Sequence, residues 1–424
     1  MDKRNPPRPG PHAPEHARPP AAWVRWRIPF AGFLLGLMGG FSYAWGVLVV
    51  PKMERFGWTK AEATLPFTVY MVVLALVMVP AGRLQDRFGP RIVAAAGAVL
   101  FFVAYALAAL VGYFPHAGWL VFSYGLIGGT ACGLTYACIV PPTRKWFPDQ
   151  PGFAVSTAVM GFGLAALVLA PVKSEYLLPV HGIEGTFLVI GTLTLVVCLG
   201  AARILENPPE GWRPYGWQPP VTTGGAAQAK REYTSGELWG TAKFWMTWFT
   251  LGSVVAGGLM SIGLIPAFGL SVGLSSAEAA VAISIFAAFN GFGRPVAGLL
   301  ADRFGLMRVM IATYCLQTAV LLVFPVFAVT LPALYLASAL LGWGFAVTLC
   351  LFPVLTATCF GVKHLGGNYG LIFTAFGLGA FAPFLGSWMF GLTGSYAPAF
   401  IAAGVLAGLG VILCAVMKKQ YNLA

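Results

Sequence analysis

One arginine lies within a stretch of sequence that is otherwise apolar enough to cross a membrane. This stretch, residues 277–301, reads AEAAVAISIFAAFNGFGRPVAGLLA and contains Arg294, which precedes the hydrophilic turn that begins at Asp302. At the rise of an α-helix, Arg294 lies about 12 Å from that turn. A charge at this depth costs several kcal/mol unless it is paired or hydrated. We therefore expect Arg294 to bind an anion.

The chemistry that suits Arg294 is recognition of a carboxylate. Away from their ends, the other predicted spans contain no Lys, Arg, Asp, Glu or His, so Arg294 is predicted to be the only fixed charge in the hydrocarbon zone. Its planar guanidinium can hold a carboxylate through two parallel hydrogen bonds. Asn290, four residues earlier, shares its helical face. Asn290 could orient the guanidinium, contact the ligand, or form a hydrogen bond between helices.

The other candidate binding residues are aromatic. Tyr43 and Tyr136 are expected near the middle of the first and fourth spans, where a phenol needs a hydrogen-bond partner. Phe345 in span 10, with Phe373 and Phe376 in span 11, could form the apolar wall of a binding cavity. Aromatic residues at helical spacing also pack in helix cores, so both roles remain open for these three.

The elements that must position these residues are membrane helices. The chain has 424 residues, of which 58% are hydrophobic and 9% are charged. A soluble domain carries about 25% charged residues, so the apolar excess must face lipid. Segments that approach or exceed ~20 apolar residues are predicted to span the bilayer as helices. There are twelve: 28–50, 64–82, 92–112, 118–141, 153–171, 183–203, 242–266, 277–301, 307–329, 332–355, 366–390 and 397–417.

The twelve segments divide into two similar halves. The pattern G-x-L-x-D-R-F-G occurs at residues 82–89 and again at 298–305. We therefore predict an all-α membrane protein with two pseudo-symmetric six-helix halves. The predicted domains are a disordered basic cytoplasmic tail (1–27), an N-terminal bundle (28–203), a cytoplasmic linker (204–241), a C-terminal bundle (242–417) and a C-terminal tail (418–424).

The distribution of basic residues predicts an orientation. With the N-terminus in the cytoplasm, the inner segments hold 21 of the 26 Lys and Arg residues. The outer loops hold four, namely Lys52, Arg55, Lys60 and Lys173. This asymmetry places both termini in the cytoplasm of a multi-pass protein of the cell inner (plasma) membrane. The net charge of +12 is spread over these loops, which argues against nucleic-acid binding.

Catalytic and metal-binding patterns are missing from the sequence. It contains no phosphate-cradling loop with a Lys and no membrane-embedded Ser, His and Asp set. The seven Cys form no CxxC pair and are expected to be small core residues, and all five His fall in tails or loops. We therefore predict no enzyme activity, no cofactor and no metal.

The repeated loop and the twelve-span layout resemble the major facilitator superfamily over nearly the whole chain. In that family the spans 1, 4, 7 and 10 line the cavity, which favours Tyr43 and Tyr136 as contacts of a substrate. The resemblance also favours a gating role for the charged residues of the repeated loop. These are Asp86, Arg87, Asp302 and Arg303. Such charges can bridge helix ends and hold one side of the cavity shut, or they can be solvated loop charges.

A narrower resemblance joins the chain to proton-linked monocarboxylate transporters and oxalate/formate antiporters. It rests on GGFSYAWGV (39–47), RKWFPDQPGFAVSTAVMGFGLA (144–165), NGFGRP (290–295) and NYG (368–370). The antiporters carry a second cation, a Lys, where this chain has Phe376, and positions matching Phe345 and Phe376 line their pocket. Two cations suit a dicarboxylate and one suits a monocarboxylate. The animal monocarboxylate transporters usually have an Asp where this chain has Asn290.

The resemblance implies secondary active transport of small monocarboxylates such as lactate or pyruvate. Alternating access with Arg294 on the carboxylate and symport of a proton are expected, although no acidic residue lies in the interior of a predicted span to hold that proton. An oxalate/formate-type carboxylate antiporter is the alternative. A receptor for a carboxylate is disfavoured because the sequence shows no sizeable soluble signalling domain. A multidrug carrier is disfavoured because such carriers usually have an acid in the cavity, whereas the predicted buried charge here is positive. The expected partners are the monocarboxylate, a proton and lipid, and the chain is expected to be a monomer.

Overall fold

The computed structural model describes residues 24–215, 217 and 232–423. Most of the predicted tail 1–27 and the middle of the predicted linker therefore lie outside the described residues. Every element of the described part is a helix, so the predicted all-α fold class is confirmed there. Eleven stretches of the described residues are long and apolar enough to cross a membrane. One of these, Pro151–Ile204, has 54 residues and is broken at Gly182, where φ is 63°, so it supplies two of the predicted twelve spans.

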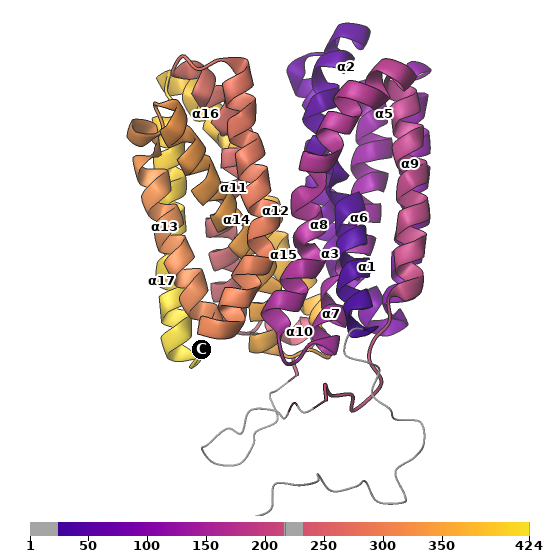
Figure 1. The fold of residues 1–424 in the computed structure, drawn as a ribbon, viewed down its shortest axis with the longest axis vertical. Helices are drawn as coiled ribbons and strands as arrows, with labels where there is room; N and C mark the ends of the chain where they lie inside the picture. Colours follow the sequence, from indigo (N-terminus) through magenta and orange to yellow (C-terminus); the bar gives the residue numbers. More distant parts are fainter. Residues whose placement is uncertain (1–23, 216, 218–231, 424) are drawn as a thin grey trace, which may run out of the picture.

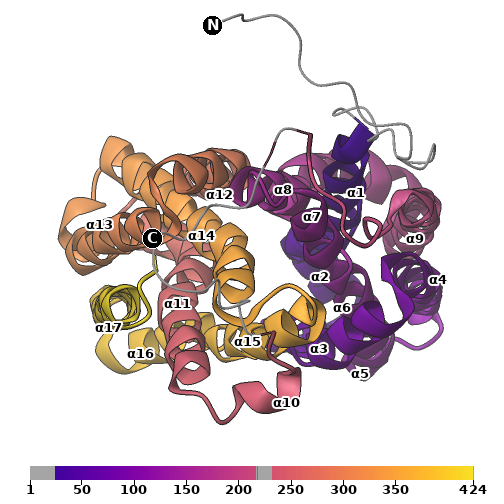
Figure 2. The same cartoon turned by 90° about the horizontal axis from the view of Figure 1, so that it is seen from below.

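The helices form two bundles that lie side by side (Figures 1 and 2). The N-terminal half contains α1 (Arg27–Gly40), α2 (Val49–Phe56), α3 (Lys60–Phe88), α4 (Pro90–Ala108), α5 (Ala117–Leu120), α6 (Gly129–Ala137), α7 (Val140–Trp146), α8 (Pro151–Val172) and α9 (Leu178–Ile204). The C-terminal half contains α10 (Ser235–Leu238), α11 (Ala242–Ser271), α12 (Ser276–Phe304), α13 (Leu306–Phe327), α14 (Leu331–Phe360), α15 (Leu365–Gly379), α16 (Ala382–Thr393) and α17 (Ala397–Gln420). The described ends of the linker and the last residues of α17 lie at one end of the bundles, which we call the linker end (Figure 1).

The helices α3 and α12 occupy matching places in the two halves and begin and end alike. Each starts with a capping box, in which Thr59 pairs with Glu62 and Ser275 pairs with Glu278. Each ends at the glycine of the repeated motif, Gly89 or Gly305, with φ of 82° and 97°. Only glycine adopts such angles without strain, so the motif ends both helices in the same way. The repeated loop therefore has a local structural cause in each half.

Shorter irregular segments connect the α-helices. They are η1 (Val24–Trp26), η2 (Phe41–Leu48), η3 (Ala109–Gly112), η4 (Val121–Gly128) and η5 (Lys173–Leu177). Through η2 the first span continues from α1 into α2 and ends at Phe56 rather than at residue 50. Through η5 the fifth span continues beyond residue 171. Both extensions carry a lysine that the sequence places in an outer loop.

Those two lysines are buried, which corrects their predicted place in outer loops and makes Arg294 one of three buried cations among the described residues. Lys52 is 0% exposed and Lys173 is 3% exposed, as deeply covered as Arg294 at 0%. A hydropathy window ends at a charged residue, so it cannot detect a lysine whose long aliphatic stem is covered by neighbouring helices.

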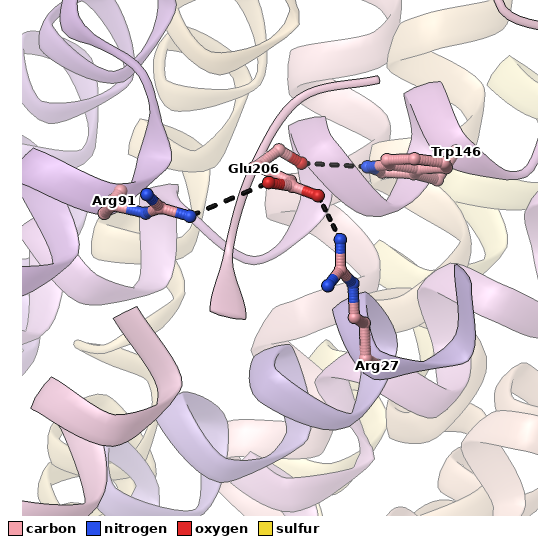
Figure 3. Close-up of polar contacts among 4 residues, drawn as sticks. All are labelled: Arg27, Arg91, Trp146 and Glu206. Atoms are coloured by element: carbon pink, nitrogen blue, oxygen red, sulfur yellow. Dashed lines mark hydrogen bonds and ion pairs between the residues drawn. The ribbon is translucent and has the colours of Figure 1, made fainter. Parts of the chain in front are cut away.

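The ends of the predicted linker are held against different halves. The Glu206 carboxylate accepts one hydrogen bond from Arg27, at the start of α1, and lies 3.7 Å from Arg91, at the start of α4 (Figure 3). Its backbone oxygen accepts a bond of 2.9 Å from the indole of Trp146 in α7. At the other end of the linker, the backbone oxygen of Tyr233 accepts a bond of 2.8 Å from Asn368 in α15. The linker therefore begins on the N-terminal half and ends on the C-terminal half.

Candidate functional site

Arg294 lies where the two halves meet, and its bonds cross between them. Its Nη1 donates to the backbone oxygen of Val159, in α8 of the N-terminal half, at 2.6 Å. Its Nε and Nη2 donate to the backbone and side-chain oxygens of Asn290, each at 3.2 Å. All three acceptors are neutral. Among the described side chains no carboxylate forms an ion pair with this guanidinium.

The close approach of α8 and α12 brings Arg294 to Val159. A Cβ added to Gly163 would lie 2.9 Å from the Cα of Gly291, and one added to Gly291 would lie 2.1 Å from Leu164. Only glycine allows the two backbones to approach this closely. The glycines of the NGFGRP and MGFGLA runs therefore set the distance across which the guanidinium reaches the other half.

Three tyrosine side chains lie close enough to Arg294 to interact with its positive charge. Two are the predicted Tyr43, in η2, and Tyr136, in α6. The third is Tyr369, in α15 of the other half, whose ring lies 5.6 Å from that of Phe373, which in turn lies 5.7 Å from the ring of Tyr136. The ring of Phe162 in α8 lies between the two predicted tyrosines, with centroid distances of 5.0 Å and 5.3 Å. The arrangement places phenol groups from both halves around one cation.

The predicted phenylalanines occupy two different places. Phe373 and Phe376 stack on each other at 4.8 Å, and Phe373 lies 5.7 Å from the ring of Tyr136. This pair therefore borders the tyrosines near Arg294. Phe345 is fully buried within the C-terminal half, where it lies 5.9 Å from Phe286 and covers Gly258 of α11. The structure thus groups two of the three phenylalanines with the tyrosines.

Sequence reasoning missed two participants of this site. Val159 contributes only a backbone oxygen, and its side chain gives no signal of that contact. Tyr369 belongs to the NYG run that resembles the carboxylate transporters. It lies near the start of its predicted span, where a tyrosine is not expected to reach the binding site. The sequence signal that could have pointed to Tyr369 was the mid-span position of Tyr136, because a buried phenol requires a hydrogen-bonding partner nearby.

The acidic residues of the repeated motif join the halves at the linker end. The carboxylate of Asp86, in α3, accepts bonds from the backbone N–H groups of Gly366 and Gly367 at 3.2 Å and 2.9 Å. These groups lie in the first turn of α15, in the other half. An anion at a helix N-terminus is stabilised by the free N–H groups and by the helix dipole.

Asp302 makes the matching contact in the opposite direction. Its two carboxylate oxygens, at the end of α12, accept bonds of 2.8 Å from the backbone N–H groups of Gly152 and Phe153. These begin α8 of the N-terminal half. Each half therefore places the aspartate of its motif on the start of a helix of the other half. The two contacts therefore join the halves at the linker end.

Glycines next to these contacts let the helices meet backbone to backbone. A Cβ on Gly82 would lie 2.0 Å from the oxygen of Gly366, and one on Gly298 would lie 2.2 Å from the oxygen of Gly152. Both glycines belong to the repeated motif. The arginines of the motif are placed differently, because Arg87 and Arg303 are exposed and lie over the rings of the phenylalanines that follow them.

This architecture defines a multi-pass membrane transporter, and comparison with known proteins identifies its family. Residues 30–273 and 248–421 match the family model of the Major Facilitator Superfamily, so the chain belongs to that family and is not an enzyme. The structure is similar to that of the transporter FucP, described as being in the outward conformation. The TM-score is 0.68 at 16% identity, covering 92% of this chain and 99% of that one. The proton:xylose symporter XylE gives a TM-score of 0.66 at 15% identity, covering 94% and 96%.

Relatives by sequence include transporters of carboxylates. The chain is 27% identical to the oxalate:formate antiporter of Oxalobacter formigenes over 83% of this chain and 81% of that protein. It is 26% identical to monocarboxylate transporter 11 of Homo sapiens over 68% of this chain and 59% of that protein. It is also 27% identical to YhjX of Escherichia coli, an uncharacterized transporter, over 84% and 86%.

Proposed function

We propose that this protein is a secondary active transporter of small monocarboxylates such as lactate and pyruvate, coupled to protons by symport. The observation that carries the proposal is Arg294, a fully buried cation at the junction of the halves whose only described hydrogen-bond partners are neutral oxygens. A buried charge without a counter-ion is costly, and a bound carboxylate supplies one. The names of two relatives, which mention oxalate, formate and monocarboxylates, support the same class of substrate.

The bonds of Arg294 suggest how binding is coupled to movement. Its Nη1 reaches Val159 of the other half, whereas its Nη2 reaches Asn290 of its own helix. A carboxylate that takes both Nη groups would compete with these oxygens and release the bond that crosses between the halves. The substrate thereby favours one arrangement of the halves over the other, as alternating access requires.

The residues around Arg294 would select the rest of the substrate. Tyr136, Tyr43 and Tyr369 provide hydroxyls for an α-hydroxy or α-keto oxygen. The stacked Phe373 and Phe376 provide an apolar wall that accepts a short alkyl group and disfavours a second carboxylate. Phe345 would act from the interior of the C-terminal half by holding the shape of this wall.

The linker end is proposed to face the cytoplasm, with both termini on that side of the cell inner membrane. This orientation places 21 of the 26 basic residues on the inner side. Asp86 and Asp302 then form the inner gate through their contacts with the first turns of α15 and α8. The two six-helix halves would move against each other about Arg294 while the linker joins them on the inner side, and the carrier is proposed to work as a monomer.

Exchange of oxalate for formate is the second candidate, because a relative with that printed name covers most of this chain. A dicarboxylate needs a second cation close to the first. In this chain the buried aromatic side chain of Phe376 occupies the position at which the resemblance implies that cation. Because Phe376 supplies no second cation, we favour a monocarboxylate over a dicarboxylate as the substrate.

A competition panel in proteoliposomes tests the proposal. Counterflow of labelled lactate would be measured against unlabelled lactate, pyruvate, formate and oxalate, and uptake would then be measured with and without an imposed pH gradient. We expect lactate and pyruvate to compete strongly, oxalate to compete weakly, and an inward proton gradient to drive uptake. Strong competition by oxalate would favour the exchanger, and lactate flux indifferent to the gradient would exclude symport.

A further inference from the structure

Two lysine side chains are buried together in the N-terminal half, away from the linker end. Lys52 lies in α2, which Figure 1 shows at the opposite end of the bundle, and Lys173 begins η5. The Nζ of Lys52 donates to the backbone oxygen of Ala63 at 3.2 Å, and that of Lys173 to the backbone oxygen of Ala44 at 3.4 Å. Both amines lie against the same short stretch of η2, because Lys52 covers the ring of Trp45 and Lys173 bonds the carbonyl of the preceding residue, Ala44.

The partners of both amines are neutral. The Nζ of Lys52 lies 3.4 Å from the ring centroid of Trp45, whose own Nε1 donates to the same Ala63 oxygen at 2.9 Å. Ala44 lies at a kink of η2, with φ −85° and ψ 17°, which turns its carbonyl out of regular helix bonding towards Lys173. The surroundings thus offer carbonyl oxygens and an aromatic face rather than a counter-ion.

The charged groups of the neighbouring helices are engaged elsewhere or turned outwards. Arg55 of α2 bonds Glu184 of α9 at 2.6 Å, and Glu62 of α3 belongs to its capping box. Three further groups are exposed: Glu54, Glu175 and His181. Among the described side chains, no acid forms an ion pair with either buried lysine.

We propose that Lys52 and Lys173 form a proton-exchange site in which one of the two amines is held neutral until it takes up a proton. Burial disfavours the charged form of an amine, and a second ammonium nearby disfavours it further. Carbonyl oxygens would repel a bound anion but accept hydrogen bonds from an amine or an ammonium. The exchange converts one amine to an ammonium on one side of the membrane and reverses this on the other. This inference rests on the proposed function, for which it supplies the proton-binding group.

The surface is hollowed beside the segment that carries Lys52, at the end opposite the linker. A cavity of about 360 Å³ lies there, lined by Pro51, which directly precedes Lys52, and by Arg55 and Gly182. Gly182 breaks the helical stretch that carries Lys173. The cavity therefore borders α2, which carries Lys52, and α9, which follows the segment of Lys173, so protons would reach the amines from this side.

Buried polar side chains continue from the lysines towards Arg294. The ring of Trp45 stacks on Tyr124 at 4.3 Å, and Tyr124 stacks on Tyr70 at 5.1 Å. The hydroxyl of Tyr70 donates to the backbone oxygen of Gly39 at 3.2 Å, and the ring of Phe162 lies against both Gly39 and Tyr43. This series ends beside the guanidinium that would hold the carboxylate.

The charges of the two sites balance for one proton and one carboxylate. The carboxylate neutralises Arg294, and the proton adds one positive charge to the lysine pair. The loaded protein then carries the same net charge as the empty one, so the loaded and empty carriers cross between states at similar electrostatic cost. A symporter of one proton with one monocarboxylate requires this balance.

The test separates exchange from proton-driven accumulation in proteoliposomes of the full chain. Counterflow of labelled lactate at equal pH needs no net proton movement, whereas one coupled proton supports about tenfold accumulation for a gradient of about one pH unit. The variants are Lys52→Met, Lys52→Arg and Lys173→Met, and Lys419→Met, at an exposed position of α17, is the matched control.

We expect every variant to retain counterflow, and the variants at Lys52 and Lys173 to lose accumulation while Lys419→Met keeps it. Lys52→Arg preserves a positive charge but cannot release its proton, so it should behave like Lys52→Met. Accumulation at the wild-type level in the lysine variants would overturn the proton site and leave the proposed function standing. Loss of counterflow in all three would overturn the site as well, because the lysines would then be structural. Failure of wild-type counterflow would refute the proposed function itself.

Discussion

Replacing Asp86 and Asp302 together by asparagine should open the linker end. Each carboxylate accepts two backbone N–H bonds from a helix start of the other half, at 2.8–3.2 Å. Asparagine keeps one acceptor oxygen, but its amide nitrogen would face the second N–H. We estimate a loss of about 2 kcal/mol per site, the low end for charge-assisted bonds because both groups are partly exposed. Two sites give about 4 kcal/mol, a shift of about 1000-fold in the equilibrium between closed and open.

Pulsed electron paramagnetic resonance can measure this shift. Spin labels would be placed at Ile92 in α4 and Arg308 in α13, two exposed positions near the linker end. The exposed Cys315 would be replaced by serine, since the other six cysteines are buried. We expect the distance distribution to move to longer values in the double variant.

Glu206 provides the matched control, because it is an acid at the same end whose contacts stay within the N-terminal half (Figure 3). Glu206→Gln should leave the distance between the labels unchanged. An unchanged distance in the double aspartate variant would refute the reasoning that these carboxylates hold the gate.

Three further substitutions test other parts of the account. Gly298→Ala would place a Cβ 2.2 Å from a backbone oxygen of α8, so the same labels should move apart, whereas Gly200→Ala, which meets no atom within 4 Å, should not change their distance. Tyr369→Phe removes a hydroxyl that is proposed to bond the substrate, so the KM for lactate in counterflow should rise about fivefold, as for the loss of a bond of about 1 kcal/mol. An unchanged KM would remove Tyr369 from the site. Phe376→Lys adds a second cation, so oxalate should become an effective competitor of lactate counterflow; continued weak competition would show that this position does not select against dicarboxylates.

The fold was largely predictable because membrane helices leave a strong signal. Spans of about 20 apolar residues have one stable conformation in lipid, and the repeated motif gives the symmetry of the halves. The ends of the spans were less predictable. Lys52 and Lys173 lie in helical extensions whose burial depends on contacts with other helices, and a window along the sequence contains no such contacts.

The site was predictable where a residue type is costly in its environment. Arg294 is of this kind, because a cation in an apolar span requires a partner wherever the helix is placed. Its bond to the backbone of Val159 could not be predicted, because every residue carries the same carbonyl. The partners of Asp86 and Asp302 are likewise backbone N–H groups of a distant helix. The place of Phe345 could not be predicted either, because an aromatic residue gives the same sequence pattern in a cavity wall and in a packed core.

Counterflow of labelled lactate by Arg294→Ala and Arg294→Lys tests the central claim most directly. Loss of the guanidinium from a buried charge pair with the substrate costs about 2–5 kcal/mol, which predicts a fall of ~30-fold or more in the alanine variant. Lysine lacks the planar fork, so Arg294→Lys should restore little. Both variants should be expressed and purified as the wild type is. Full counterflow by Arg294→Ala would contradict the account, because the carboxylate would then be held elsewhere.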